Sequence, residues 1–182
     1  IGVSLFPQDG KTVDQVMRAA DAAMYHAKTL GRNNAQFYSA ELNQVVHQHL
    51  LLEASLARAI RNREMVLGYQ PKVDLRTGKV VGAEALVRWH HPVDGVISPD
   101  VFIPIAEQTG LIVPLGDWVI DEACATLRTL GELGIHDFVI AVNLSARQLR
   151  QRRFVNRLAE TLARHGVPAH RLELEVTESQ LM

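Results

Sequence analysis

The sequence predicts an α/β protein in which short strands alternate with longer helices. Residues 138–142 form a continuous, largely β-branched run, and residues 172–178 alternate between apolar and polar side chains. The first pattern is typical of a strand covered on both faces, and the second of a strand with one buried face. Residues 115–133 repeat apolar side chains at helical intervals. This alternating order favours a parallel sheet flanked by helices.

The first segment predicts a strand followed by a helix. The chain opens at Ile1 inside an apolar stretch, which we expect to be a strand. Thr12 and Gln15 have capping-box spacing, and Gly31 should end the helix. The apolar residues that recur at helical intervals between them are Val13, Val16, Met17, Ala20, Met24 and Ala27. A second helix over residues 39–63 should connect this segment to the rest.

Four strands and three helices are expected beyond residue 51. The strands lie near residues 66–74, 79–89, 137–143 and 171–177. Ser98 and Pro99 begin the first helix, which Pro104 should kink. The other two helices cover Leu115–Leu133, ended by Gly134, and Phe154–His165, ended by Gly166 and Pro168.

The run from Glu84 to Arg88 places a carboxylate and a guanidinium on one face of a strand. Period-two alternation puts Gly82, Glu84, Leu86 and Arg88 on one side, and Ala83, Ala85, Val87 and Trp89 on the other. A carboxylate can hold a metal ion, and a guanidinium can bind a phosphate through two hydrogen bonds. The pair by itself is half of a phosphoester site.

Two further oxygen donors lie at strand ends. Asn143 follows the run of residues 138–142, and Glu175 faces away from the leucines of its own strand. In a parallel α/β protein, groups at the carboxyl ends of strands meet at the functional face. Glu84, Asn143 and Glu175 are therefore three hard oxygen donors that could converge on Mg²⁺ or Mn²⁺.

Five motifs follow one another along the second part of the chain: YQPKVDL, GAEALVRW, residues 91–110 (HPVDGVISPDVFIPIAEQTG), NLSARQL and LELEVTES. From about Leu51 to Met182, these linked motifs resemble the EAL domain, the phosphodiesterase of the bacterial second messenger cyclic di-GMP. The resemblance implies that Glu84, Asn143 and Glu175 are metal ligands and that the two glutamates are also catalytic. It implies that Gln70, Leu86 and Arg88 contact the dinucleotide. Glu178 would anchor a loop.

The same resemblance implies a fold. EAL domains are similar to a TIM-type (β/α) barrel with an antiparallel first strand, and such barrels need roughly 200 to 250 residues. About four strands fit into residues 51–182, so we expect the N-terminal half of the barrel. The family's paired aspartates, catalytic lysine, and later glutamate and glutamine would follow Met182. They would complete a two-metal site in the intact domain.

Residues 1–40 resemble the last strand and helix of a GGDEF domain, the diguanylate cyclase partner of EAL. Lys28 and Arg32 match family positions that touch nucleotide phosphates. We therefore interpret the chain as a fragment of a GGDEF–EAL protein. Residues 1–40 would be the GGDEF remnant, residues 41–63 the connecting helix, and residues 51–182 the N-terminal half of the EAL domain.

Three functions remain open at this stage. The intact domain would hydrolyse one phosphodiester bond of cyclic di-GMP to give linear 5'-pGpG, and it could pair as a homodimer. Alternatively, the domain is a catalytically silent cyclic di-GMP receptor, which the aspartates beyond Met182 would decide. A third alternative is that these residues are an incompletely folded piece with neither property.

Each candidate residue also has an ordinary structural explanation. Isolated glutamates such as Glu84 and Glu175 are usually solvated, Asn143 could be a turn or cap residue, and Gln70 could simply end a strand. Arg88 could pair with a surface carboxylate. The histidines at 47, 49, 90 and 91 resemble a metal cluster on paper, but the first two lie on different faces of a predicted helix. Cys124 is expected in the core.

Composition excludes several other classes. The chain has 182 residues, 47% of them hydrophobic, and a formal net charge of -1, so no basic excess suggests a nucleic-acid polymer as partner. A single cysteine excludes a disulfide framework and a thiolate zinc site within one chain. No stretch approaches the roughly 18 apolar residues of a membrane span. We expect a cytoplasmic location, with any membrane anchor of the parent protein upstream of Ile1.

Overall fold

The computed structural model describes residues 1–30, 33–62 and 64–176, leaving aside the side chains of residues 29 and 43–49. The chain divides into two compact units, Ile1–Ala54 and Ser55–Met182. A two-stranded sheet belongs to the first unit and a five-stranded sheet to the second. Among the described residues, none of the helices is long and apolar enough to cross a membrane.

The first unit packs one helix against a short parallel strand pair. Strands β1 (Gly2–Val3) and β2 (Gln36–Phe37) flank helix α1 (Val13–Thr29) in the sequence. The Thr12 hydroxyl caps α1 by accepting from the Gln15 amide at 3.3 Å. The Gln15 side chain accepts from the Lys11 amide at 2.7 Å, one residue earlier than a capping box requires. The predicted helix is therefore confirmed, whereas Gly31 lies outside the described residues.

Alanines are the buried hydrophobic residues of α1. Ala19, Ala23 and Ala27 are buried, whereas Val13 and Met17 are largely exposed. The reason is the close approach of the helix to β1, where a Cβ on Gly2 would lie 2.0 Å from the Ala20 carbonyl oxygen. Only small side chains fit beneath such a contact, so alanines rather than the larger apolar residues form this interface. Helix α2 (Ala40–Arg61) follows, over most of the predicted connecting segment.

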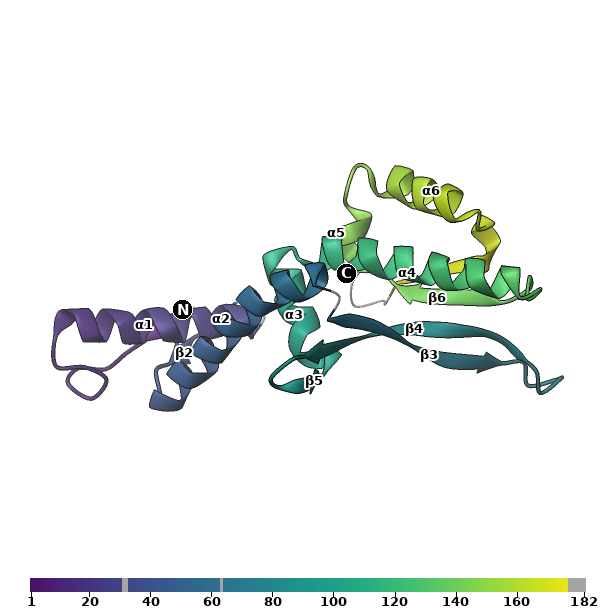
Figure 1. Cartoon of the computed structure of the whole chain (residues 1–182). Coiled ribbons are helices and arrows are strands. Elements are labelled where there is room, and N and C mark those ends of the chain that lie inside the picture. The colour runs from purple at the N-terminus through teal and green to yellow at the C-terminus, as the bar shows by residue number, and fades with distance from the viewer. Residues whose placement is uncertain (31–32, 63, 177–182) are drawn as a thin grey trace. The chain divides into compact units, whose positions relative to one another are not determined.

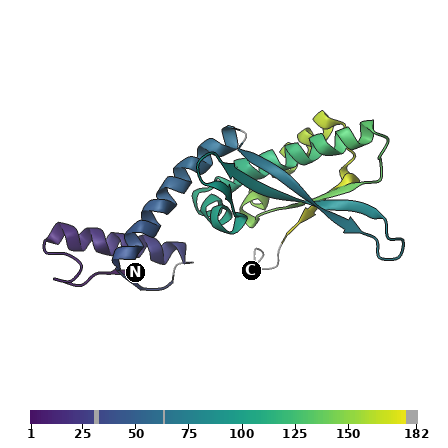
Figure 2. The same ribbon diagram turned by 60° about the horizontal axis from the view of Figure 1, so that its bottom comes forward.

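The second unit contains a mixed sheet in the order β3-β4-β6-β7, with β5 paired to β4. Strand β3 runs antiparallel to β4, while β4, β6 and β7 are mutually parallel. Figure 2 shows how strongly the β3–β4 pair twists. The strands are β3 (Met65–Val73), β4 (Val80–His91), β5 (Gly95–Ile97), β6 (Val139–Asn143) and β7 (Leu172–Glu175). The four expected strands are present, and β5 is an addition to them.

Helices cover one face of this sheet. Helix α4 (Ile112–Glu132) runs along β6, and α6 (Phe154–His165) packs on α4 (Figure 1). Helix α3 (Pro99–Thr109) begins after Ser98 as predicted and continues through Pro104; the kink there stays a prediction. Helix α3 ends with a C-cap at Gly110, which adopts a left-handed φ of 86°, and α4 starts at Ile112, three residues before Leu115. Two short elements were not predicted, α5 (Ala146–Leu149) and a 3-10 turn over Ala169–Arg171.

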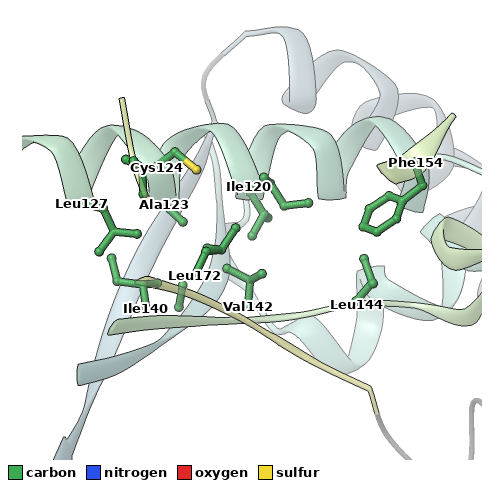
Figure 3. Packing of buried hydrophobic residues seen from close by; sticks show 12 residues of the cluster. Ile120, Ala123, Cys124, Leu127, Ile140, Val142, Leu144, Phe154 and Leu172 are labelled. Atoms are coloured by element: carbon green, nitrogen blue, oxygen red, sulfur yellow. The ribbon is translucent and has the colours of Figure 1, made fainter. Parts of the chain in front are cut away.

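The core lies between α4 and the sheet. Ile120, Ala123 and Leu127 of α4 face Ile140 and Val142 of β6, as Figure 3 shows. The leucines of β7, Leu172 and Leu174, belong to the same cluster, which confirms the alternation predicted for that strand. Cys124 is buried in the cluster, as expected, and burial raises the pKa of its thiol to about 11. The alternate residues of each strand lie on the opposite face of the sheet, away from this core.

Candidate active site

The predicted polar residues share the sheet face that the helices do not cover. Gln70 of β3 lies directly opposite Glu84 of β4 in the strand register. Glu84 pairs with Ala141 of β6, and Asn143 at the end of β6 pairs with Glu175 at the end of β7. Because alternate residues share a face, all four positions lie on the side away from α4. Glu84 itself lies in the first half of β4, not at its carboxyl end.

Glu84 and Asn143 are in direct contact. The Asn143 amide donates from Nδ2 to Glu84 Oε1 at 2.6 Å. The Leu144 amide donates to the Glu175 carbonyl at 2.8 Å, which extends the pairing of β6 with β7 just past Asn143. A half-turn of the Asn143 amide would direct its oxygen toward the same point as the Glu84 carboxylate. The two side chains can therefore act as neighbouring oxygen donors.

Glu175 has a different partner, which the sequence interpretation missed. The Lys72 ammonium of β3 donates to Glu175 Oε1 at 2.6 Å and to Glu173 Oε2 at 3.1 Å. The hydrogen bond to Glu175 is the main cause that raises the pKa of Lys72. A signal was available, because Lys72 stands two residues after Gln70 and so shares its face. Its long-range partners were not predictable from that alternation.

The donor set fits a hard divalent cation in its chemistry. Two carboxylates and one amide oxygen are ligand types that suit Mg²⁺ and Mn²⁺. In the described part of the chain, no three His, Cys, Asp or Glu side chains gather closely enough to hold a metal ion. Any ion here would therefore rely on Asn143 beside Glu84 and Glu175. Glu175 already holds one positive charge, the Lys72 ammonium, in an ion pair.

Leu86 and Arg88 line a cavity toward the carboxyl end of β4. The cavity measures about 430 Å³, and it lies among β4, α3, the first half of α4 and the segment after β6. Arg88 Nη1 donates to the Val87 carbonyl at 3.0 Å. Polar and apolar lining side chains include Leu86, Arg88, Asp100, Glu107, Asn143 and Gln148. A cavity of this size and mixed lining is typical of a small-molecule site.

The segment after Asn143 is held by a capping box that the sequence interpretation missed. Ser145 caps α5 by accepting from the Gln148 amide, and the Gln148 side chain accepts from the Ser145 amide at 3.1 Å. Gln148 is buried, and its Nε2 finds no hydrogen-bond partner among the described residues. It packs against Gly116, where a Cβ would lie 1.8 Å from that nitrogen. This packing fixes the exit of β6 and with it Asn143.

The remaining candidates are not brought into the site. Glu178 and Arg32 lie outside the described residues, as do the side chains of His47 and His49. His91 pairs instead with Asp94, Nδ1 to Oδ2, at 2.8 Å, within the β4–β5 turn. His90 is its immediate neighbour on the strand and so faces the other side. A histidine metal cluster is therefore absent from the described residues.

Comparisons with known proteins point to one family. The model of the EAL domain family matches residues 53–182. All 182 residues align at 47% identity with "Bifunctional diguanylate cyclase/cyclic di-GMP phosphodiesterase MucR" of Pseudomonas aeruginosa, covering 27% of that protein. They align at 42% identity with "Cyclic di-GMP phosphodiesterase NbdA" of the same organism, covering 23% of it. The chain thus spans about a quarter of the length of these curated relatives.

Solved structures of EAL proteins also resemble this chain. The structure titled "PaMucR Phosphodiesterase, c-di-GMP complex" matches 72% of this chain and 53% of its own, with a TM-score of 0.69 and 47% identity. The cGMP-bound form of the EAL enzyme Bd1971 matches 92% of this chain and 47% of its own, with a TM-score of 0.71 and 29% identity. The described fold is therefore one that EAL domains share.

Proposed function

This chain belongs to the EAL domain family, and from that premise we propose that residues 51–182 are the N-terminal half of a cyclic di-GMP phosphodiesterase domain. The domain would hydrolyse cyclic di-GMP to linear 5'-pGpG. The names of the two relatives from Pseudomonas aeruginosa support this assignment. The sheet supports a partial TIM-type barrel, because an antiparallel first strand precedes three parallel ones.

The placement of three side chains is the main structural support for the proposed metal site. Glu84, Asn143 and Glu175 come from three neighbouring parallel strands and share the open face of the sheet, with Asn143 in contact with Glu84. We propose that these three side chains hold Mg²⁺ or Mn²⁺, and that the intact domain holds a second ion. When bound, such an ion supplies Lewis-acid catalysis of phosphodiester hydrolysis. The carboxylates orient the ion, and the capping box after β6 keeps Asn143 in place.

The substrate would lie across Gln70, Leu86 and Arg88. Arg88 binds one phosphate of the dinucleotide through its guanidinium, since a planar fork of donors matches phosphate oxygens. Leu86 gives an apolar surface in the lining of the 430 Å³ cavity. Gln70, directly opposite Glu84, would hydrogen-bond the same ligand from the antiparallel strand. Asp100 offers an acceptor in the cavity for the N–H groups of a guanine base.

The proposal extends to the organisation of a longer protein. Residues 1–40 would be the C-terminal remnant of a GGDEF domain, residues 41–63 a connecting helix, and Glu178 a loop anchor. Support comes from the alignment of all 182 residues with a bifunctional cyclase and phosphodiesterase. The boundary between the two units falls after Ala54, inside α2. A cytoplasmic location and a homodimer formed through the EAL domain are part of the same proposal.

The test uses the full natural protein that contains this chain. Glu84→Ala should abolish Mg²⁺- or Mn²⁺-dependent release of pGpG from cyclic di-GMP, because it removes one of the metal ligands. Glu160→Ala, an exposed glutamate on α6, is the matched control and should leave turnover unchanged. Undiminished turnover by the Glu84 variant would contradict the proposed mechanism.

A silent cyclic di-GMP receptor is the second candidate, and one observation favours it. The Lys72 ammonium neutralises Glu175, so this carboxylate has a cation without any metal. A receptor would bind cyclic di-GMP with unchanged affinity in the presence of a chelator and release no pGpG at any Mn²⁺ concentration. Measuring binding and turnover on the same sample separates the two functions.

A further inference from the structure

Lys72 reaches its two partners across the whole width of the sheet. It lies on β3, whereas Glu173 and Glu175 lie on β7, with β4 and β6 in between. Three strand spacings in a flat sheet amount to about 14 Å, and side chains that leave a flat sheet perpendicular to it would not close that distance. Their contact at 2.6 Å and 3.1 Å therefore requires the open face to be concave.

Two of the positions under this contact carry small side chains. Gly82 is the register partner of Lys72 on β4, and Ala141 stands between Glu84 and Glu173 on the next row of the sheet. Neither position sends a large side chain into the concave face. The lysine stem can therefore lie across the sheet, with its ammonium among the carboxylates that the proposed metal site uses.

We propose that Lys72 competes with the divalent cation for Glu175. It is a positioning residue, because its ammonium pairs with the Glu175 carboxylate until the cation displaces it. Glu175 Oε1 accepts from the Lys72 ammonium, and the same oxygen cannot ligate an ion while the ammonium covers it. Glu173 then retains the ammonium once Glu175 is released, because Lys72 already contacts both carboxylates. This inference rests on the proposed metal site and adds a residue that sets its affinity.

The expected size of the effect follows from exposure. The side chains of Lys72, Glu173 and Glu175 are 37%, 54% and 34% exposed, so solvent screens both ion pairs. The ion pair with Glu175 is the one that the cation must displace, and an exposed pair of this kind changes an equilibrium constant by at most about fivefold. Removing the competing ammonium should therefore tighten divalent-cation binding by roughly two- to fivefold.

The experiment measures Mn²⁺ binding to the full protein by calorimetry, without cyclic di-GMP. The signal that depends on Glu84 is defined by subtracting a Glu84→Gln variant. Lys72→Met should lower the Kd for Mn²⁺ by roughly two- to fivefold, and Lys72→Arg should keep it near the natural value because the positive charge remains. Lys79→Met is the matched control, because Lys79 is an exposed lysine in the turn of the same hairpin.

Glu173 provides a second test with the opposite sign. Glu173→Gln should weaken Mn²⁺ binding severalfold, because the ammonium then has Glu175 as its remaining carboxylate partner. In the Lys72→Met background, Glu173→Gln should change the Kd much less, since no ammonium is left to be held. Non-additivity of the two substitutions is the signature of a shared interaction, and a structural role for Lys72 would not produce it.

Failure of this inference can be told apart from failure of the proposed function. If the natural protein binds Mn²⁺ through Glu84 but Lys72→Met leaves the Kd unchanged or raises it, the competition is refuted and the metal site stands. Additive effects of the two substitutions refute it as well. If the natural protein shows no Glu84-dependent Mn²⁺ binding, both the metal site and the competition are refuted.

Discussion

Replacing Arg171 by Met tests how the strand that carries Glu175 is held in place. The Arg171 side chain is buried beside the start of β7, and its guanidinium donates to three carbonyl groups. They belong to Phe138 at 3.1 Å, Leu127 at 3.3 Å and Ile135 at 2.8 Å. The side chain thus links the C-terminal half of α4, the loop after it and the residue before β6 to the start of β7.

The expected loss of stability in the Arg171→Met variant follows from these three hydrogen bonds. Each carbonyl left without its charged donor costs about 1–3 kcal/mol. Methionine keeps most of the buried volume and avoids the several kcal/mol needed to desolvate a guanidinium. The two effects oppose each other, so we expect a net destabilisation of about 2–4 kcal/mol. This lowers the hydrogen-exchange protection of β6 and β7 by roughly thirty- to a thousandfold.

The assay is native-state hydrogen exchange of the full protein, read by mass spectrometry for peptides that cover β6 and β7. Arg164→Met is the matched control, because its guanidinium pairs with Asp121 at 2.8 Å on the surface and is 63% exposed. That pair should contribute about 0 to 1 kcal/mol. Equal protection in the two variants would refute the reasoning that Arg171 anchors β7.

Four further outcomes are expected. Arg88→Ala should raise the KM for cyclic di-GMP more than it lowers kcat in steady-state assays; a loss of kcat at constant KM would contradict the phosphate-binding role. The pKa of Cys124 near 11 keeps the thiol protonated below that pH, so iodoacetamide should label the folded protein far more slowly at pH 8 than the urea-unfolded protein. Gly116→Ala, which crowds Gln148, should lower the free energy of unfolding by about 1–3 kcal/mol in urea titrations. Leu127→Ala should lower it by about 2–5 kcal/mol, and the exposed Leu133→Ala by less than about 0.5 kcal/mol.

Local patterns predicted most of the strands and helices. The β-branched run before Asn143 and the alternation around Glu175 identified β6 and β7, because burial on one or two faces leaves a periodic trace in the sequence. Helix α6 has the predicted bounds, since Gly166 supplies the left-handed residue that ends it. The three residues of β5 are too few to show any alternation, so that strand left no comparable signal.

Contacts between distant residues were less predictable. Lys72 and Glu175 are 103 positions apart, and their ion pair depends on the curvature of the sheet, which no local pattern reports. Within the apolar pattern of α1, Ala27 is buried but Val13 and Met17 are largely exposed. The close approach of the helix to Gly2 favours alanines at this interface over larger apolar residues. In both cases packing geometry, and not residue type alone, decides which residues are in contact.

Locating Mn²⁺ by anomalous scattering in crystals of the full protein tests the central claim most directly. We predict an anomalous peak at roughly 2.0 to 2.6 Å from a side-chain oxygen of each of Glu84, Asn143 and Glu175. The Lys72 ammonium should then contact Glu173 and no longer Glu175. A protein that releases pGpG while its Mn²⁺ lies away from these three side chains would contradict the account.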